Sequence, residues 1–101
     1  MKKVYYLGHC GSGLSVHYQL IDLVREEGNK LIFQIEGFDS ELCKWRTITL
    51  KGYRDKKRDF DGNLIDYIRF RSSKEDFKFH FIEEKEIEDN IEPESFFITN
   101  G

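Results

Sequence analysis

The sequence predicts an all-β protein, a small antiparallel barrel or curled sheet with five to six strands. The apolar residues make up 39% of the 101 residues, and most are Phe, Tyr, Ile, Leu or Val, the types that fit a pleated surface. Several segments alternate apolar and polar residues with the two-residue period of strands. A chain of this length has room for one domain with a modest core.

We expect a single β-rich domain over residues 1–82, followed by an acidic C-terminal segment, residues 83–101, that packs back on it. The first strand is expected at Lys3–Leu7, where apolar residues dominate. The glycine-rich stretch Gly8–Gly13 then marks a turn.

Residues 14–26 allow two interpretations. As a strand, the segment alternates until Leu20, where the pattern slips by one residue and requires a bulge. As a helix, it gathers polar residues such as Ser15 and Gln19 on one face, and Gly28 ends it. The second interpretation gives an alternative fold, α+β, with one helix at about 14–26 on an antiparallel sheet.

A central hairpin is expected between Lys30 and Tyr53. Leu31 and Phe33 recur at every second position of its first strand, and Ile48 alternates with polar residues in its second strand. The polar connection between them is too long for a two-residue turn.

After this hairpin, Arg54–Asn63 is expected to be a charged loop. A second hairpin is expected from Tyr67–Arg71 and Phe77–Ile82, because both segments alternate across a polar turn. At the end of the chain, Phe96–Ile98 is expected to pack back as an edge strand or a short helix.

The formal net charge of −3 conceals two clusters of opposite sign. Between Lys44 and Arg58 there are seven basic residues and one acidic residue, and between Glu83 and Glu94 there are seven acidic residues and one basic residue. The electrostatic field of the protein is therefore expected to be bipolar.

The basic cluster is interleaved with aromatic residues. Cations that hold phosphates, beside aromatic faces on which a base can stack, are what a nucleotide or single-stranded nucleic acid requires. The alternative is a solvated strand edge and loop, with Trp45 covering the core. The candidate nucleotide- or nucleic-acid-binding residues are Lys44, Trp45, Arg46, Lys51, Tyr53, Arg54, Lys57 and Arg58.

The acidic cluster supports a different function, that of a small phage-type inhibitor or immunity protein that occupies the basic surface of a protein partner. A third possibility is that the acidic segment neutralises the protein's own basic cluster. An exposed edge strand also makes a homodimer possible. The candidate residues for a protein partner are Glu83, Glu84, Glu86, Glu88 and Asp89.

No motif in the sequence indicates catalysis. Gly8-His9-Cys10-Gly11 resembles the nucleophile turn of a hydrolase, but such an enzyme needs a longer chain to supply the acid, the oxyanion hole and the substrate pocket. The Cys and His residues also lack the spacing of a zinc site. We therefore expect no enzyme activity, cofactor or metal. The sequence contains no apolar run long enough to span a membrane and no signal peptide, so we expect a cytoplasmic protein without membrane partners.

One stretch resembles a known family. Phe33-Gln34-Ile35-Glu36-Gly37-Phe38-Asp39, followed after five residues by Trp45-Arg46-Thr47-Ile48-Thr49-Leu50, is similar to the core of WYL domains. The resemblance covers about half of the chain. It implies an SH3/Sm-like small β-barrel that binds a nucleotide or nucleic acid as a regulatory module. Of the basic ligand-binding positions of that family, Arg46 is the one present here.

Overall fold

The computed structural model describes residues 1–10, 15–70 and 79–99, which form seven β-strands and no helix. The strands are β1 (Lys2–Cys10), β2 (Ser15–Glu27), β3 (Lys30–Asp39), β4 (Lys44–Arg58), β5 (Leu64–Phe70), β6 (His80–Ile87) and β7 (Phe96–Thr99). The all-β prediction is confirmed, and β2 excludes the helical interpretation of this segment. No helix among these residues is long and apolar enough to cross a membrane.

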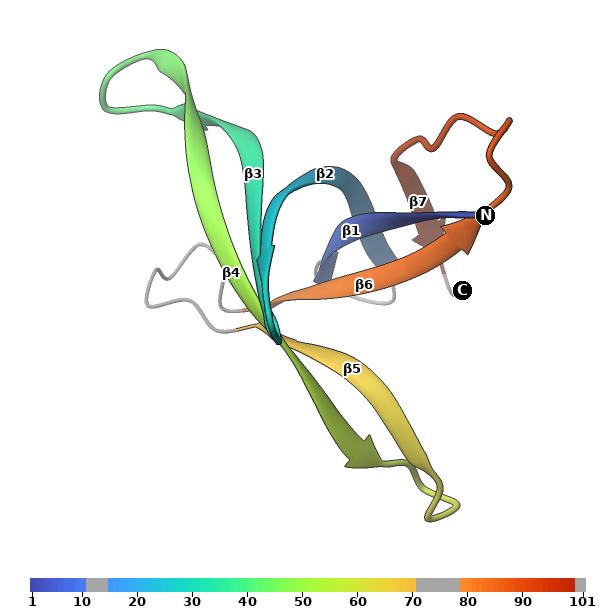
Figure 1. The fold of residues 1–101 in the computed structure, drawn as a ribbon. Helices are drawn as coiled ribbons and strands as arrows, with labels where there is room; N and C mark the ends of the chain where they lie inside the picture. Colours follow the sequence, from blue (N-terminus) through green and yellow to red (C-terminus); the bar gives the residue numbers. More distant parts are fainter. Residues whose placement is uncertain (11–14, 71–78, 100–101) are drawn as a thin grey trace.

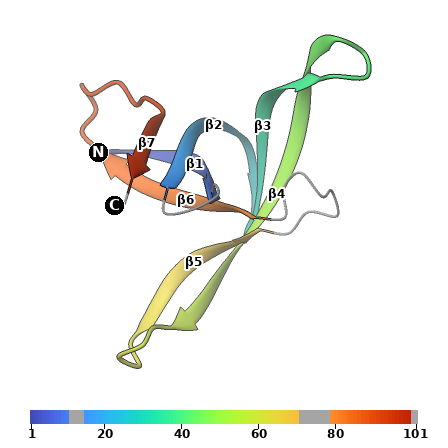
Figure 2. The same ribbon diagram turned by 180° about the vertical axis from the view of Figure 1, so that it is seen from behind.

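Six of the strands form a ring. Their order in the sheet is β1-β6-β5-β4-β3-β2, and β1 also pairs with β2, so the sheet curls until its two ends meet (Figure 1). Every pairing is antiparallel. β7 lies outside the ring as an edge strand on β2, as Figure 2 shows from behind. The C-terminal triplet therefore adopts the strand and not the helix.

The core fills the ring and comes from alternate positions of its strands. Phe33 and Leu31 of β3 are completely buried at its centre. The other buried members are Tyr5, Leu7, Ile21, Leu50, Ile68 and Ile82. Because successive side chains of a strand point to opposite faces, these positions identify the inner face of each strand.

A bulge in β2 changes which of its residues face inward. The register against β3 shifts between Leu23 and Arg25, a few residues later than the slip expected at Leu20. Beyond the shift, Glu26 lies opposite the buried Leu31 and therefore on the inner face. Gly28, at φ +59°, then makes the turn into β3, a backbone conformation that favours glycine.

The prediction of a charged loop directly after Tyr53 is wrong. β4 continues through Arg58, because β5 pairs with it from Arg58 opposite Leu64 to Gly52 opposite Phe70. Beyond Arg54 both faces of β4 meet solvent, so this part of the strand has no apolar alternation. A turn follows it, in which Asp59 Oδ1 accepts hydrogen bonds from the backbone N–H groups of Asp61 and Asn63.

The second predicted hairpin corresponds to β5 and β6, which pair antiparallel and face each other at Ile68 and Ile82. β5 also pairs with β4, and β6 also pairs with β1. The predicted turn and Phe77 lie outside the described residues. β6 also runs past residue 82, so the first acidic residues belong to a strand of the ring.

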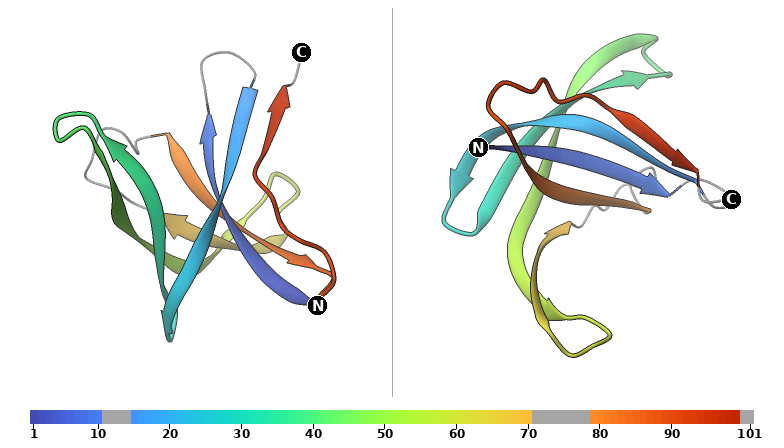
Figure 3. Two further views of the ribbon diagram at one scale, coloured as in Figure 1. Left: turned by 90° about the horizontal axis from the view of Figure 1, so that it is seen from above. Right: turned by 90° about the vertical axis from the view of Figure 1, so that its right-hand side faces the viewer.

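β4 is the longest strand, and its two ends form two arms. One end pairs with β3 and the other with β5, and the two hairpins extend in opposite directions from the ring (Figures 1 and 3). At about 3.3 Å per residue, β4 spans about 45 Å. The basic cluster of the sequence therefore runs along an extended strand.

Candidate nucleic-acid interface

The alternation of β4 divides the eight candidate residues between two faces. The even-numbered positions Leu50 and Gly52 are buried in the ring, so odd-numbered side chains point to the outside. The outer face carries Trp45, Lys51, Tyr53 and Lys57, and all four are exposed. The inner side carries Lys44, Arg46, Arg54 and Arg58.

The outer face of β4 continues onto β5 through a chain of polar and cation–π contacts. The Arg69 guanidinium lies 5.5 Å from the centre of the Tyr53 ring, and the Lys57 ammonium lies 4.7 Å from the centre of the Tyr67 ring. Between them, Asp55 Oδ2 accepts a hydrogen bond from the Tyr67 hydroxyl and pairs with Arg69 at 3.9 Å. The result is an ordered surface of rings and cations.

At the other end of β4, the outer face finishes in an aromatic pair. Phe38 of β3 lies opposite Trp45, with ring centres 5.6 Å apart in an edge-to-face arrangement. Trp45 is 68% exposed, so it does not cover the core as the alternative interpretation expected. We use the name β4 track for the outer-face residues Phe38, Trp45, Lys51, Tyr53, Lys57, Tyr67 and Arg69.

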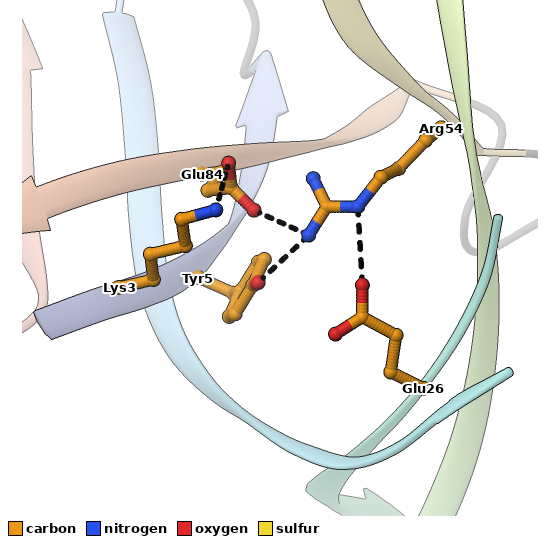
Figure 4. Close-up of polar contacts among 5 residues, drawn as sticks. All are labelled: Lys3, Tyr5, Glu26, Arg54 and Glu84. Atoms are coloured by element: carbon orange, nitrogen blue, oxygen red, sulfur yellow. Dashed lines mark hydrogen bonds and ion pairs between the residues drawn. The ribbon is translucent and has the colours of Figure 1, made fainter. Parts of the chain in front are cut away.

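The side chain of Arg54 lies on the face of β4 opposite to the β4 track and is held inside the ring (Figure 4). Its Nη2 lies 2.8 Å from Glu84 Oε2 and donates a hydrogen bond to the Tyr5 hydroxyl at 3.2 Å, while its Nε lies 3.3 Å from Glu26 Oε1. Lys3 Nζ lies 3.9 Å from the second oxygen of Glu84. The guanidinium thus joins β1, β2, β4 and β6.

The contacts between Arg54, Glu84 and Tyr5 shift the pKa values of all three side chains. Hydrogen bonding to Glu84 raises the pKa of Arg54, so it stays cationic. Burial works to raise the pKa of Glu84, but hydrogen bonds from Arg54 and Tyr5 outweigh burial and lower it. Burial raises the pKa of Tyr5, and the neighbouring Glu84 adds to that effect. At neutral pH the site therefore holds an ion pair and a neutral phenol.

Two other cations on the inner side have partners within the protein. Arg46 Nε lies 3.4 Å from Asp39 Oδ2, across the β3–β4 hairpin. Arg58 Nη1 donates a hydrogen bond to the carbonyl of Gly62 at 2.7 Å. These contacts stabilise the two arms and leave the track as the surface where cations and rings are open to a ligand.

The acidic candidate residues lie on β6 and just after it. Glu84 points inward to Arg54, and Asp89 pairs with the N-terminal ammonium at 3.5 Å. Glu86 lies on the same face of β6 as Glu84, and Glu83 lies on the opposite face. Glu88 is exposed. Among the described residues, the pair Arg54–Glu84 is the one ion pair that joins the acidic cluster to the basic cluster.

Sequence reasoning missed Tyr67 and Arg69. Both alternate on the same face of β5, but their proximity to Tyr53 and Lys57 depends on the β4–β5 register. The two-residue period of the predicted strand already places Lys44 and Arg46 on the face opposite to Lys51. The faces of Arg54, Lys57 and Arg58 follow only from the continuation of β4 to Arg58. Lys30, opposite Tyr53, is a further cation of this face.

The comparisons with known proteins add no relative. No family model matches the chain, and neither a curated protein nor a solved structure is significantly similar to it.

Proposed function

We propose that this protein binds single-stranded nucleic acid along the β4 track and acts without catalysis, as a binding or regulatory module. The observation that carries the proposal is the run of exposed rings and cations on one face of β4 and β5, from Trp45 to Lys57. Bases stack on aromatic faces, and lysine and arginine hold the phosphates.

The length of the track favours a strand over a single nucleotide. Trp45 and Lys57 are separated by about 40 Å of extended chain, whereas a nucleotide covers only a small part of that length. Sites for single strands extend over roughly 4–16 nucleotides per domain. The rings at the two ends of the track suit bases several nucleotides apart.

The arrangement also disfavours double-stranded DNA. Stacking on the exposed rings of Trp45 and Tyr53 requires bases whose faces are uncovered, and in a duplex the neighbouring base pairs cover them. The resemblance to WYL domains points to the same ligand class, nucleotide or nucleic acid.

The proposal is tested by fluorescence anisotropy with a labelled twelve-nucleotide oligothymidine. We expect saturable binding at 50 mM salt that weakens steeply by 200 mM, because each phosphate contact releases counterions. The double variant K51E/K57E should lower the affinity at least about tenfold, since it reverses both lysines of the track.

A matched control is available on the same strand. K44E/K56E makes the same change in net charge on the other side of β4, so long-range repulsion is equal in the two variants. The control should lose much less affinity than K51E/K57E. Equal losses, or no binding of the natural sequence at low salt, would refute the track as the site. Competition by ATP alone, with no preference for the oligonucleotide, would instead identify a nucleotide site.

A further inference from the structure

All three histidines of the chain lie in one row across three neighbouring strands. His9 of β1 is directly opposite His80 of β6 on one side and His17 of β2 on the other. Both pairings keep their register here, and the backbone N–H of Cys10 extends the β1–β6 ladder by donating to the carbonyl of Phe79. The histidines are far apart in the sequence, so only the strand pairing brings them together.

The three imidazoles share the inner face of the curled sheet. His9 follows the buried Leu7 by two positions, and His80 precedes the buried Ile82 by two positions. His17 lies on the same face because it is opposite His9. The row lies at one end of the ring, where His80 and Leu7 contribute to the wall of a cavity of about 480 Å³. Side chains on the concave side of a curled sheet converge, so the three imidazoles point toward a common region.

The rings of His9 and His80 already lie close together. Their centres are 4.5 Å apart, and their planes differ by 14°. Zinc binds an imidazole nitrogen at about 2.0–2.1 Å, so two nitrogens of a tetrahedral site are about 3.3 Å apart. A small rotation of either ring therefore brings one nitrogen of each residue to this separation.

His17 has further to turn. Its ring lies against Phe97 of β7, with ring centres 6.4 Å apart, and no three potential ligands among the described residues are already arranged to hold a metal ion. The side chain of His17 is exposed, and exposed side chains change rotamer within nanoseconds. Its backbone is paired on both sides, with β1 and with β7. Binding therefore requires a rotation of this side chain and no change in the sheet.

The chemistry of the row selects its ligand. Cys10 comes directly after His9 and so lies on the opposite face of β1, which leaves a row of imidazoles alone. Imidazole suits zinc and related transition metals, whereas calcium and magnesium take oxygen ligands. Without a metal the arrangement brings little stability, because His9 and His17 are exposed and protonated imidazoles side by side repel each other.

We infer that His9, His17 and His80 form a binding site for a divalent transition-metal ion such as Zn²⁺, with water completing the coordination. The expectation of no metal relied on spacing along the sequence, which does not detect ligands that come from three different strands. The site lies on β1, β2 and β6, apart from the β4 track, and does not depend on the nucleic-acid proposal.

Proton NMR of the intact natural protein tests the site, because each of the three histidines gives its own imidazole signals. We expect the signals of all three to change on titration with Zn²⁺ and to saturate at one ion per chain, with a Kd below about 100 µM. Changes at only one or two histidines, a different stoichiometry, or a weaker Kd would overturn the inference.

Single variants identify the ligands by calorimetric titration with Zn²⁺. H9N, H17N and H80N should each weaken binding at least about tenfold, since each removes one of three ligands. C10S is the matched control, because it changes the residue beside His9 on the opposite face of β1 and should leave the affinity nearly unchanged. A loss in C10S as large as that in H9N would indicate a thiol site and overturn the inference, as would a smaller loss in any histidine variant.

Discussion

Arg54 lies in the middle of a basic stretch of sequence but is a structural residue in the fold. Its guanidinium contacts Glu84, Tyr5 and Glu26, and only 31% of its side chain is exposed. Such a network contributes to stability when all of its members are present, because removing one leaves a charge partly buried and unpaired.

Replacing Glu84 with Gln is therefore expected to lower the free energy of unfolding by about 2 kcal/mol at pH 7. Urea unfolding followed by circular dichroism measures this loss. Asp66→Asn is the control, because its pair with Lys56, at 3.6 Å, is far more exposed and should change stability by less than about 0.5 kcal/mol. Similar losses in both variants would show that Arg54 is not the connecting residue.

The lowered pKa of Glu84 also predicts a dependence on pH. The folded pKa lies below that of an unfolded glutamate, about 4.3, so the stabilisation is present above that pH and is lost as the pH falls through the folded value. The natural protein should therefore lose more stability than E84Q between about pH 5 and pH 3. Urea midpoints at the two pH values give the comparison, and parallel losses would contradict it.

Gly52 tests the close packing of β4 against β5 and the core. A Cβ at this position would lie 2.6 Å from Ile68 Cγ2 and 3.4 Å from the Phe33 ring. Because Ile68 is β-branched and buried, we expect Gly52→Ala to cost about 1–3 kcal/mol. Thr49→Ala, on the exposed side of the same strand, should cost less than about 0.5 kcal/mol. A neutral Gly52→Ala variant would show that the two strands are less tightly packed.

At the scale of elements, β7 is held to the ring by its pairing with β2 and by an aromatic cluster. The Phe96 ring stacks on Tyr18 with centres 4.5 Å apart and contacts Tyr6 at 5.4 Å, and the Lys85 ammonium lies over it. These contacts lie outside the ring, so β7 is expected to open independently of the core.

Phe96→Ala should release β7 while the ring stays folded. We expect faster amide hydrogen exchange in Phe96–Ile98, a loss of about 1–2 kcal/mol, and unchanged protection around Phe33. Phe97→Ala changes a neighbouring ring that is 60% exposed and should have a smaller effect. Unfolding of the whole ring in Phe96→Ala would mean that β7 is an integral part of the core.

The elements also show how far the sequence could predict the fold. The β3–β4 hairpin was predictable because Leu31, Phe33 and Leu50 belong to two runs in which apolar residues recur at every second position, and this face is buried. The continuation of β4 to Arg58 was not, because a strand with two solvated faces has no apolar period. The bulge near Leu23 was expected, but its position depends on the pairing with β3.

Only the part of the candidate site that lies within one predicted strand could be predicted from the sequence. Trp45, Lys51 and Tyr53 share one face by the period of the predicted strand, whereas Lys57 joins them because β4 continues to Arg58. Tyr67 and Arg69 join them only through the β4–β5 register, and the partners of Arg54 come from three other strands. Such long-range pairings leave no trace in local sequence patterns.

At the scale of the molecule, the positive and negative clusters lie on different strands and meet at one described ion pair, Arg54–Glu84. The acids of β6 therefore do not neutralise the β4 track directly.

At 150 mM salt, charges more than about 8 Å apart are largely screened. We expect E83Q/E86Q to change oligonucleotide affinity less than about threefold, measured by anisotropy; a much larger gain would mean that the acidic cluster masks the track.

The most direct test of the β4 track uses Trp45, the single tryptophan of the protein. The fluorescence of its exposed ring should be quenched when a base stacks on it. A titration with oligothymidine at 50 mM salt therefore reports contact at the end of the β4 track itself. The account predicts saturable quenching that is reversed by 200 mM salt and lost in K51E/K57E. Fluorescence that stays constant throughout the titration at low salt would contradict it.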